Sequence, residues 1–146
     1  MTIQTKAEGI QWDLSDLYRS PEDPKISEDL KRGESLALAF EKKYKPLFEK
    51  ICQNGAFPLA ELLKDYKEIA TLLTRIGVYS YLLFAEKTNV ASIGAFMQKT
   101  QDQLTYIQSH LLFWDVAWNK LGDNTVEKLT GDPKVATDKH YLMNLR

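Results

Sequence analysis

The chain has little of the chemistry that metal centres and catalytic sites use. Its 146 residues include one cysteine, Cys52, and two histidines, His110 and His140. A single cysteine excludes an internal disulfide and an all-cysteine metal site, and as a nucleophile it would need a histidine partner that the sequence does not identify. Neither histidine begins the His-Glu-x-x-His pattern, which places two zinc ligands and a general base on one helix face.

A strong charge of either sign and a long apolar run are also missing. The 19 basic and 20 acidic residues leave a net charge of −1, whereas nucleic-acid-binding proteins usually carry a basic face. The polar N-terminus has no signal-peptide core, and no uninterrupted apolar run approaches the roughly 18 residues that span a bilayer. We therefore expect a cytoplasmic protein that binds neither nucleic acid nor a membrane.

Apolar side chains instead recur at helical spacing. Asp23 and Pro24 predict a capped helix start, Pro46 predicts a kink or split near Tyr44, and residues 54–55 predict the helix end. The steps between apolar residues alternate between four and three, as in helices packed side by side. This first stripe consists of Ile26, Leu30, Gly33, Ala37, Phe40, Tyr44, Leu47 and Ile51, and its glycine would let a neighbouring helix approach closely.

Two further long helices are predicted, over residues 58–87 and 88–121. Thr88 and Asn89 are expected to cap the start of the helix over residues 88–121. No period-two alternation long enough for a strand is present. Short loops favour antiparallel neighbours, so the predicted fold class is all-α, with long antiparallel helices in one bundle or lobe. Shorter features follow in order: a helix end at Gly122–Asp123, a helix near residues 126–129, a turn at residues 131–133 and a helical start at Lys134.

A distinctive segment precedes the first long helix. Residues 12–18, Trp-Asp-Leu-Ser-Asp-Leu-Tyr, predict a short helix capped by Asp13. Trp12 and Leu17 then occupy the two positions of a hydrophobic staple. We divide the chain into this N-terminal segment, residues 1–22, and a helical region, residues 23–146.

Two segments, residues 76–85 and 111–118, are apolar on nearly every side of a helix. Three long helices cannot surround both segments. Either the segments leave large apolar patches exposed, or a partner covers them. The partner would be more of the same polypeptide or a second subunit.

Few polar residues stand out as site candidates. His110 is predicted to be a core or interface histidine that donates to a carbonyl, and His140 a surface residue. Asp115 lies among aromatic neighbours, which predicts a buried carboxylate in a structural ion pair or interface hydrogen bond, with a substrate contact as the alternative.

The remaining carboxylates predict solvated helix faces rather than an acid–base pair. Glu41 and Lys45 are one turn apart and predict a weak ion pair, whereas Glu61 and Asp65 are expected to repel each other mildly. The sequence contains no glycine-rich phosphate loop and no nucleophile elbow. It therefore predicts no catalytic, cofactor-binding or metal-binding residue in this chain.

Several segments, in their order along the chain, resemble the N-terminal helical region of oligoendopeptidase F, a branch of the thimet-type zinc metallopeptidases. Each segment is a weak match alone, and their shared order spans residues 12–146. The segments are Trp12–Tyr18 with Ser20–Pro24, Tyr44, Ile76–Ala85, Thr88, Leu111–Trp114, His140–Leu142 and Leu145–Arg146.

The resemblance implies a helical lobe that precedes a catalytic domain and helps to wall a channel for short peptides. The zinc motif of such enzymes lies several hundred residues downstream, so no catalytic residue is carried over and zinc would belong to the parent enzyme. It further implies that the polypeptide continues beyond Arg146, in mid-helix. The alternative function is a stand-alone helical protein–protein interaction module, for example a dimer.

Overall fold

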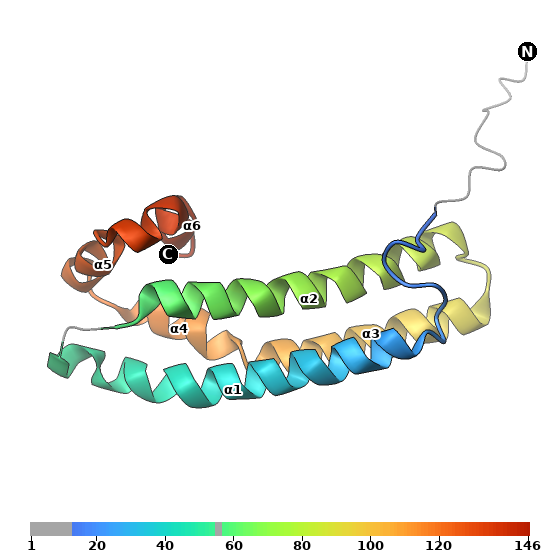
Figure 1. Ribbon diagram of the computed structural model, residues 1–146, viewed down its shortest axis with the longest axis horizontal. Coiled ribbons are helices and arrows are strands. Elements are labelled where there is room, and N and C mark those ends of the chain that lie inside the picture. The colour runs from blue at the N-terminus through green and yellow to red at the C-terminus, as the bar shows by residue number, and fades with distance from the viewer. Residues whose placement is uncertain (1–12, 55–56) are drawn as a thin grey trace, which may run out of the picture.

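The computed structural model describes residues 13–54 and 57–146, except for the side chains of residues 52–54. Three long helices, α1 (Pro24–Asn54), α2 (Leu59–Glu86) and α3 (Ala91–Ser109), run side by side in alternating directions (Figure 1). The described residues contain no strand, which confirms the all-α prediction. The later elements are α4 (Leu112–Lys120), α5 (Asp123–Thr130), the 3-10 helix η1 (Pro133–Asp138) and α6 (Lys139–Asn144).

Helix α1 begins where the sequence predicts. The Asp23 carboxylate accepts hydrogen bonds from the backbone N–H groups of Lys25 and Arg19, both at 3.0 Å, and Pro24 takes the first helical position. Of the two outcomes predicted for Pro46, a split is wrong, because α1 continues to Asn54. Pro46 lies on the exposed side of α1, where water can replace the helical hydrogen bond that proline cannot donate.

The predicted apolar stripes form the core. Nearly all of the first stripe is buried, and Ala37 and Tyr44 are fully inaccessible. A side chain at Gly33 would place its Cβ 3.1 Å from Cδ2 of Leu73 on α2, so glycine permits the close approach of α1 and α2. The buried residues of α2 are Leu59, Leu62, Leu63, Ile69, Leu73, Ile76, Tyr79, Ser80 and Leu83.

The predicted short helix near the N-terminus is wrong: within the described part, the segment forms one turn. The Asp13 carboxylate accepts from the Ser15 N–H at 3.0 Å, and the Leu17 and Tyr18 N–H groups both donate to the Leu14 carbonyl. Tyr18 then buries its ring, leaving it 2% exposed. The burial of Tyr18 determines the path of the chain more strongly than the local helix-capping pattern does. Trp12, the other predicted staple residue, lies outside the described residues.

Tyr18 fixes the N-terminal segment to the bundle. Its ring meets the Tyr79 ring edge-on, with centroids 5.2 Å apart, and its hydroxyl donates to Asp29 at 2.7 Å. Arg75 of α2 donates to the Leu17 carbonyl at 3.0 Å and lies over the Tyr18 ring. The segment is therefore attached to both α1 and α2.

The third predicted helix is divided into α3 and α4. At the junction, the N–H groups of His110 and Leu111 donate to the carbonyls three residues earlier, at 3.2 and 2.9 Å. This tighter turn changes the helix direction without proline or glycine, and it directs Trp114 and Trp118 into the core. The sequence carries no breaking residue here, so periodicity predicted one helix.

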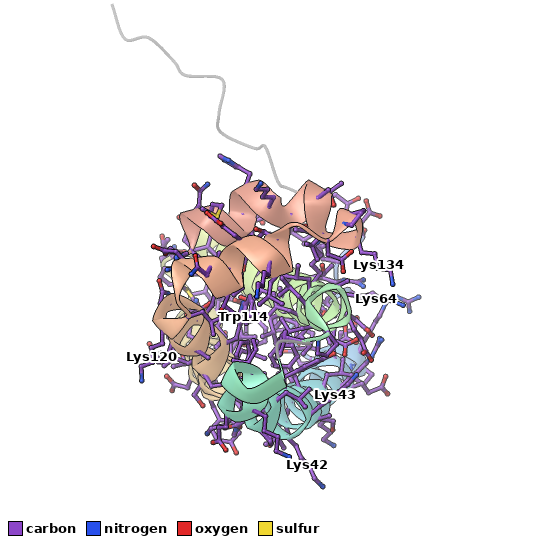
Figure 2. The ribbon with its side chains drawn as sticks, turned by 90° about the vertical axis from the view of Figure 1, so that its left-hand side faces the viewer. Lys42, Lys43, Lys64, Trp114, Lys120 and Lys134 are labelled. Carbon is purple, nitrogen blue, oxygen red and sulfur yellow. The ribbon has the colours of Figure 1, made fainter. Side chains whose placement is uncertain are left out.

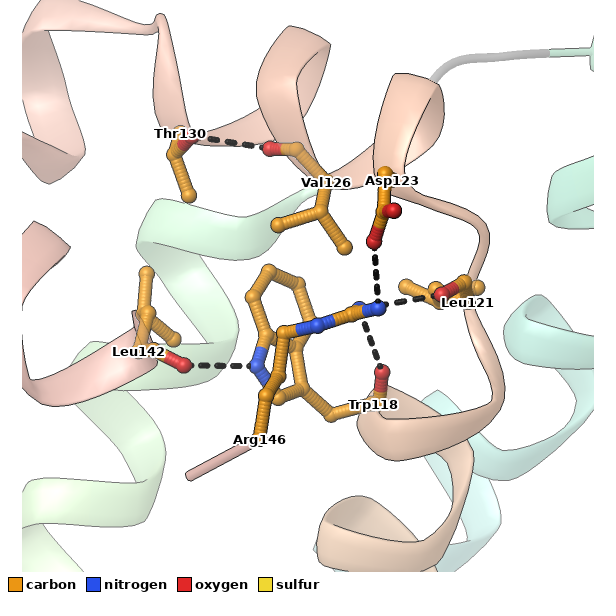
Figure 3. A network of polar contacts seen from close by, with 7 residues as sticks. All are labelled: Trp118, Leu121, Asp123, Val126, Thr130, Leu142 and Arg146. Atoms are coloured by element: carbon orange, nitrogen blue, oxygen red, sulfur yellow. Dashed lines mark hydrogen bonds and ion pairs between the residues drawn. The ribbon is translucent and has the colours of Figure 1, made fainter. Parts of the chain in front are cut away.

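Trp114 and Trp118 are both fully buried within the described chain. For these two residues, the expectation that an outside partner is needed is therefore wrong. The chain covers them itself. Trp118 Nε1 donates to the Leu142 carbonyl of α6 at 2.9 Å, and Arg146 donates to the Leu121 carbonyl at 2.9 Å (Figure 3). The large apolar residues of the two segments that stay exposed are Val78, Tyr81, Leu112 and Val116.

Several predicted helix ends are displaced by a few residues. The N-cap of α3 is Val90, without a side-chain capping bond, rather than Thr88 or Asn89. Gly122 is the N-cap of α5 and does not end the preceding helix, which stops at Lys120. Helix α6 ends at Asn144.

The joint substitution Trp114→Asp and Trp118→Asp should unfold the chain. Loss of each buried aromatic ring lowers the free energy of unfolding by about 3–5 kcal/mol. Burial of two unpaired carboxylates lowers it further. The total loss then exceeds the stability of an ordinary domain, roughly 5–15 kcal/mol. Far-UV circular dichroism measures the outcome, with Val116→Asp on the exposed side of α4 as the matched control. Retained helicity in the double variant would place these rings outside the core.

Candidate functional site

His110, at the junction of α3 and α4, pairs with a carboxylate of α1. Its Nδ1 lies 2.7 Å from Glu41 Oε2, and the other oxygen of Glu41 accepts from Lys45 at 3.2 Å. The hydrogen bond with His110 is the main cause that lowers the pKa of Glu41, and Lys45 adds to it. The prediction that His110 donates to a carbonyl is therefore wrong, because α1 brings Glu41 beside the junction. The predicted Glu41–Lys45 ion pair is confirmed.

Three buried polar atoms cluster around this junction without a hydrogen-bond partner among the described residues. They are His110 Nε2, Trp114 Nε1 and Asp115 Oδ1. The end-on view of Figure 2 places Trp114 in the interior, whereas the labelled lysines point outward. Buried polar atoms are nearly always paired, so three within six residues mark this junction as a candidate site.

Asp115 lies on the side of α4 that faces α2 and α6. Burial raises its pKa, and within the described chain its Oδ1 forms neither the ion pair nor the hydrogen bond that the sequence predicted. The pKa of Tyr66 on α2 rises to about 12, mainly through burial, with added contributions from Tyr141 and Asp115. Asp115, Tyr66 and Tyr141 together resemble a desolvated carboxyl group beside two phenols rather than an acid–base pair.

The junction lacks the other parts of a catalytic or metal site. The described residues contain no group of three or more His, Cys, Asp or Glu side chains that could hold a metal ion. His140 is exposed, as predicted, and its Nε2 lies 3.1 Å from Asn144 Nδ2. The Cys52 side chain lies outside the described residues. The His110–Glu41 contact joins α1 to the junction of α3 and α4.

The expected repulsion between Glu61 and Asp65 is offset by a shared cation. Lys43 of α1 pairs with Glu61 and, at 3.3 Å, with Asp65. Asp65 also accepts a hydrogen bond from the Tyr44 hydroxyl at 2.6 Å. These contacts join α1 to α2, and they are exposed enough to contribute only modestly to stability.

A second candidate is a surface without charge, which we call the neutral face. It lies along α2 and α3, which share one hollow, and exposed residues of α4 follow the α3 stripe at steps of four. Its exposed residues are Thr71, Thr74, Val78, Tyr81 and Ala85 of α2, Gln101, Thr105 and Gln108 of α3, and Leu112 and Val116 of α4. Helical spacing within each stripe explains why these side chains point the same way.

Two hollows follow the neutral face and share Thr74. One, of about 510 Å³, lies between α2 and α3, with the buried side chains of Leu73 and Leu104 in its lining. The other, of about 600 Å³, lies between α2 and the C-terminal helices and ends at the Lys67–Asp138 ion pair. The surface is thus uncharged, carries both apolar and neutral polar side chains, is hollowed and is suited to contact with another macromolecule.

A third concavity, of about 630 Å³, separates the start of α1 from α3. Charges of both signs line it, from Asp23, Glu34 and Asp102 to Lys31 and Lys99. Because these charges can be hydrated or can pair with one another, this cleft gives no specific indication of a ligand.

Helix α2 has the length and the composition of a membrane-spanning helix. An 18-residue window within it has a mean hydropathy of 1.2, and 33% of that window is buried in the bundle. Residues 69–86 carry two charges, Arg75 and Glu86. A core helix of a soluble protein also meets these criteria, so hydropathy alone does not assign α2 to a membrane.

Comparisons of the chain with protein-family models, with curated proteins and with solved structures find no match.

Asp115→Asn should raise the free energy of unfolding at pH 7 by roughly 1 kcal/mol, because the amide removes the charge of a half-buried carboxylate whose Oδ1 has no partner among the described residues. The folded-state pKa of Asp115 is raised, so the wild-type protein loses stability as the pH rises through that pKa. The advantage of the variant should vanish below the unfolded pKa of aspartate, about 3.9. Urea titrations between pH 3 and pH 8 measure the free energy of unfolding of both proteins. A variant less stable than the wild type at pH 7 would mean that the carboxylate has a partner.

Proposed function

We propose that this chain is the non-catalytic N-terminal lobe of a zinc metallo-oligoendopeptidase that hydrolyses short peptides. The observation that carries the proposal is the ordered set of segments, from Trp12–Tyr18 to Leu145–Arg146, that resembles oligoendopeptidase F. The comparisons add no support to this proposal. The all-helical architecture is compatible with it.

In this proposal the lobe contributes shape rather than chemistry. Zinc in the parent's catalytic domain would polarise the scissile carbonyl and activate water. The long helices α1 to α3 would form a stiff wall of the peptide channel, because their stripes bury against one another and the Lys43 contacts tie α1 to α2. The catalytic domain would be the partner of the lobe, and short peptides the substrates of the whole enzyme.

A stand-alone helical interaction module is the second candidate. The neutral face favours it, since its exposed apolar side chains, such as Val78, Tyr81 and Leu112, lie in a surface without charge of the kind that marks a contact with another protein. The two candidates differ in what supplies the partner: the same polypeptide in the first, a separate chain in the second.

The first candidate predicts that the native reading frame continues beyond Arg146 and encodes a His-Glu-x-x-His motif. Sequencing the genomic locus downstream tests this prediction. An immunoblot of native cells with an antibody against this region should then detect a polypeptide much larger than 16.8 kDa. A stop codon directly after Arg146 in the native gene would contradict the lobe proposal and leave the interaction module.

The purified chain should neither bind zinc stoichiometrically nor cleave a quenched fluorescent peptide. The reason is that its described residues offer no three-ligand cluster, and its sequence lacks the zinc motif. Isothermal titration with zinc and a fluorescence assay measure the two properties, with a zinc peptidase as the positive control of the assay. EDTA-sensitive cleavage by the pure chain would contradict the assignment of a non-catalytic lobe.

A further inference from the structure

We propose that the neutral face is a self-association surface, on which α2 of one copy packs antiparallel against α2 of a second copy about a two-fold axis near Val78. The inference rests on the face itself and goes beyond the peptidase proposal. It assigns an occupant, a second copy of this chain, to the surface that the fold leaves exposed.

The charge distribution favours a second copy. Near the axis of a two-fold pair each residue meets its own counterpart, so a charged side chain there would oppose a like charge. Between Glu68 and Glu86, α2 carries one charge, Arg75. Arg75 is directed to the other side of α2, where it donates to the Leu17 carbonyl at 3.0 Å. The face can therefore meet itself without repulsion.

The α3 side of the face is also free of charge. The charged residues of α3 are Lys99 and Asp102, and both line the cleft beside the start of α1 rather than the neutral face. Along the face, α3 instead presents Gln101, Thr105 and Gln108. These side chains supply both donors and acceptors, and each can therefore pair with its like across a symmetric contact.

Helix α1 gives the contrast. Its exposed face would require desolvation of many charges before it could pair with itself, and such burial is costly without matched partners. The exposed charged residues of α1 are Lys25, Glu28, Lys31, Arg32, Lys42, Lys43, Lys45, Glu49 and Lys50.

The face carries both a projection and a recess. Tyr81 is 58% exposed and stands beside the hollow of about 510 Å³. Gly77 lines this hollow without a side chain, so the recess stays open. In an antiparallel pair about Val78, Tyr81 of one copy lies at the level of Thr74 and Arg75 of the other, next to the recess there. Each copy thus supplies its Tyr81 ring to the recess of the other copy and receives the other copy's ring at its own recess.

The area is sufficient for a weak dimer. The α2 stripe from Thr71 to Ala85 is roughly 20 Å long at about 1.5 Å per residue, and a second helix beside it gives a similar width. Such a footprint, about 400 Å² on each copy and roughly 800 Å² in total, falls in the range of weak, transient interfaces, below about 1,200 Å². We expect a reversible dimer with a micromolar dissociation constant.

Sedimentation velocity on the full chain, from about 1 to about 500 µM, tests the inference. The wild-type chain should shift from monomer to dimer, whereas Val78→Glu should remain monomeric because two carboxylates would meet near the axis. Leu38→Glu on α1 is the matched control, since Leu38 and Val78 are 43% and 42% exposed, and it should dimerise like the wild type. Circular dichroism verifies that both variants are folded.

Cross-linking gives a second readout if Val78→Glu fails to fold. In a Cys52→Ser background, Val78→Cys should form a covalent dimer on mild oxidation, because paired cysteines need Cβ atoms about 4 Å apart, and Leu38→Cys should not. A wild-type chain that stays monomeric throughout would overturn the inference, as would equal effects of Val78→Glu and Leu38→Glu. So would a monomer that binds phosphatidylcholine vesicles through this face. None of these results bears on the peptidase proposal, which the downstream reading frame decides.

Discussion

The arrangement of the chain depends on the burial of two tryptophans at the far end of the bundle. The tight turn at His110 and Leu111 directs Trp114 and Trp118 inward, and both rings become inaccessible to water. Trp118 also donates its indole N–H to the Leu142 carbonyl, which fastens α6 to α4. The Lys67–Asp138 ion pair and the bond from Arg146 to the Leu121 carbonyl attach the C-terminal helices as well.

The helical architecture could be predicted because its cause is local. Apolar steps of three and four place Ile26, Phe40 and Ile51 on one side of α1, and these residues are buried. The division between α3 and α4 could not be predicted, since it uses a change in hydrogen-bond spacing and no breaking residue. The pairing of His110 with Glu41 joins residues 69 positions apart, and only the packing of α1 against the junction brings them together.

The apolar segments illustrate where composition misleads. Residues 111–118 suggested a missing partner, yet Trp114 packs against Phe48 of α1 and Trp118 donates to the Leu142 carbonyl of α6. Helix α6 is too short to carry a strong periodic signal, so its contact with Trp118 was not visible in the sequence. What stays exposed is the neutral face around Val78 and Tyr81, the surface that we propose for self-association.

Hydrogen exchange of the indole N–H groups, followed by NMR, tests the role of Trp118 most directly. If Trp118 Nε1 is buried and bonded to the Leu142 carbonyl, its proton should exchange only through global unfolding, as slowly as the most protected amides of α2. Exchange at the rate of a free indole, while those amides remain protected, would show that α6 is not fastened to the bundle and would contradict the proposed organisation of the core.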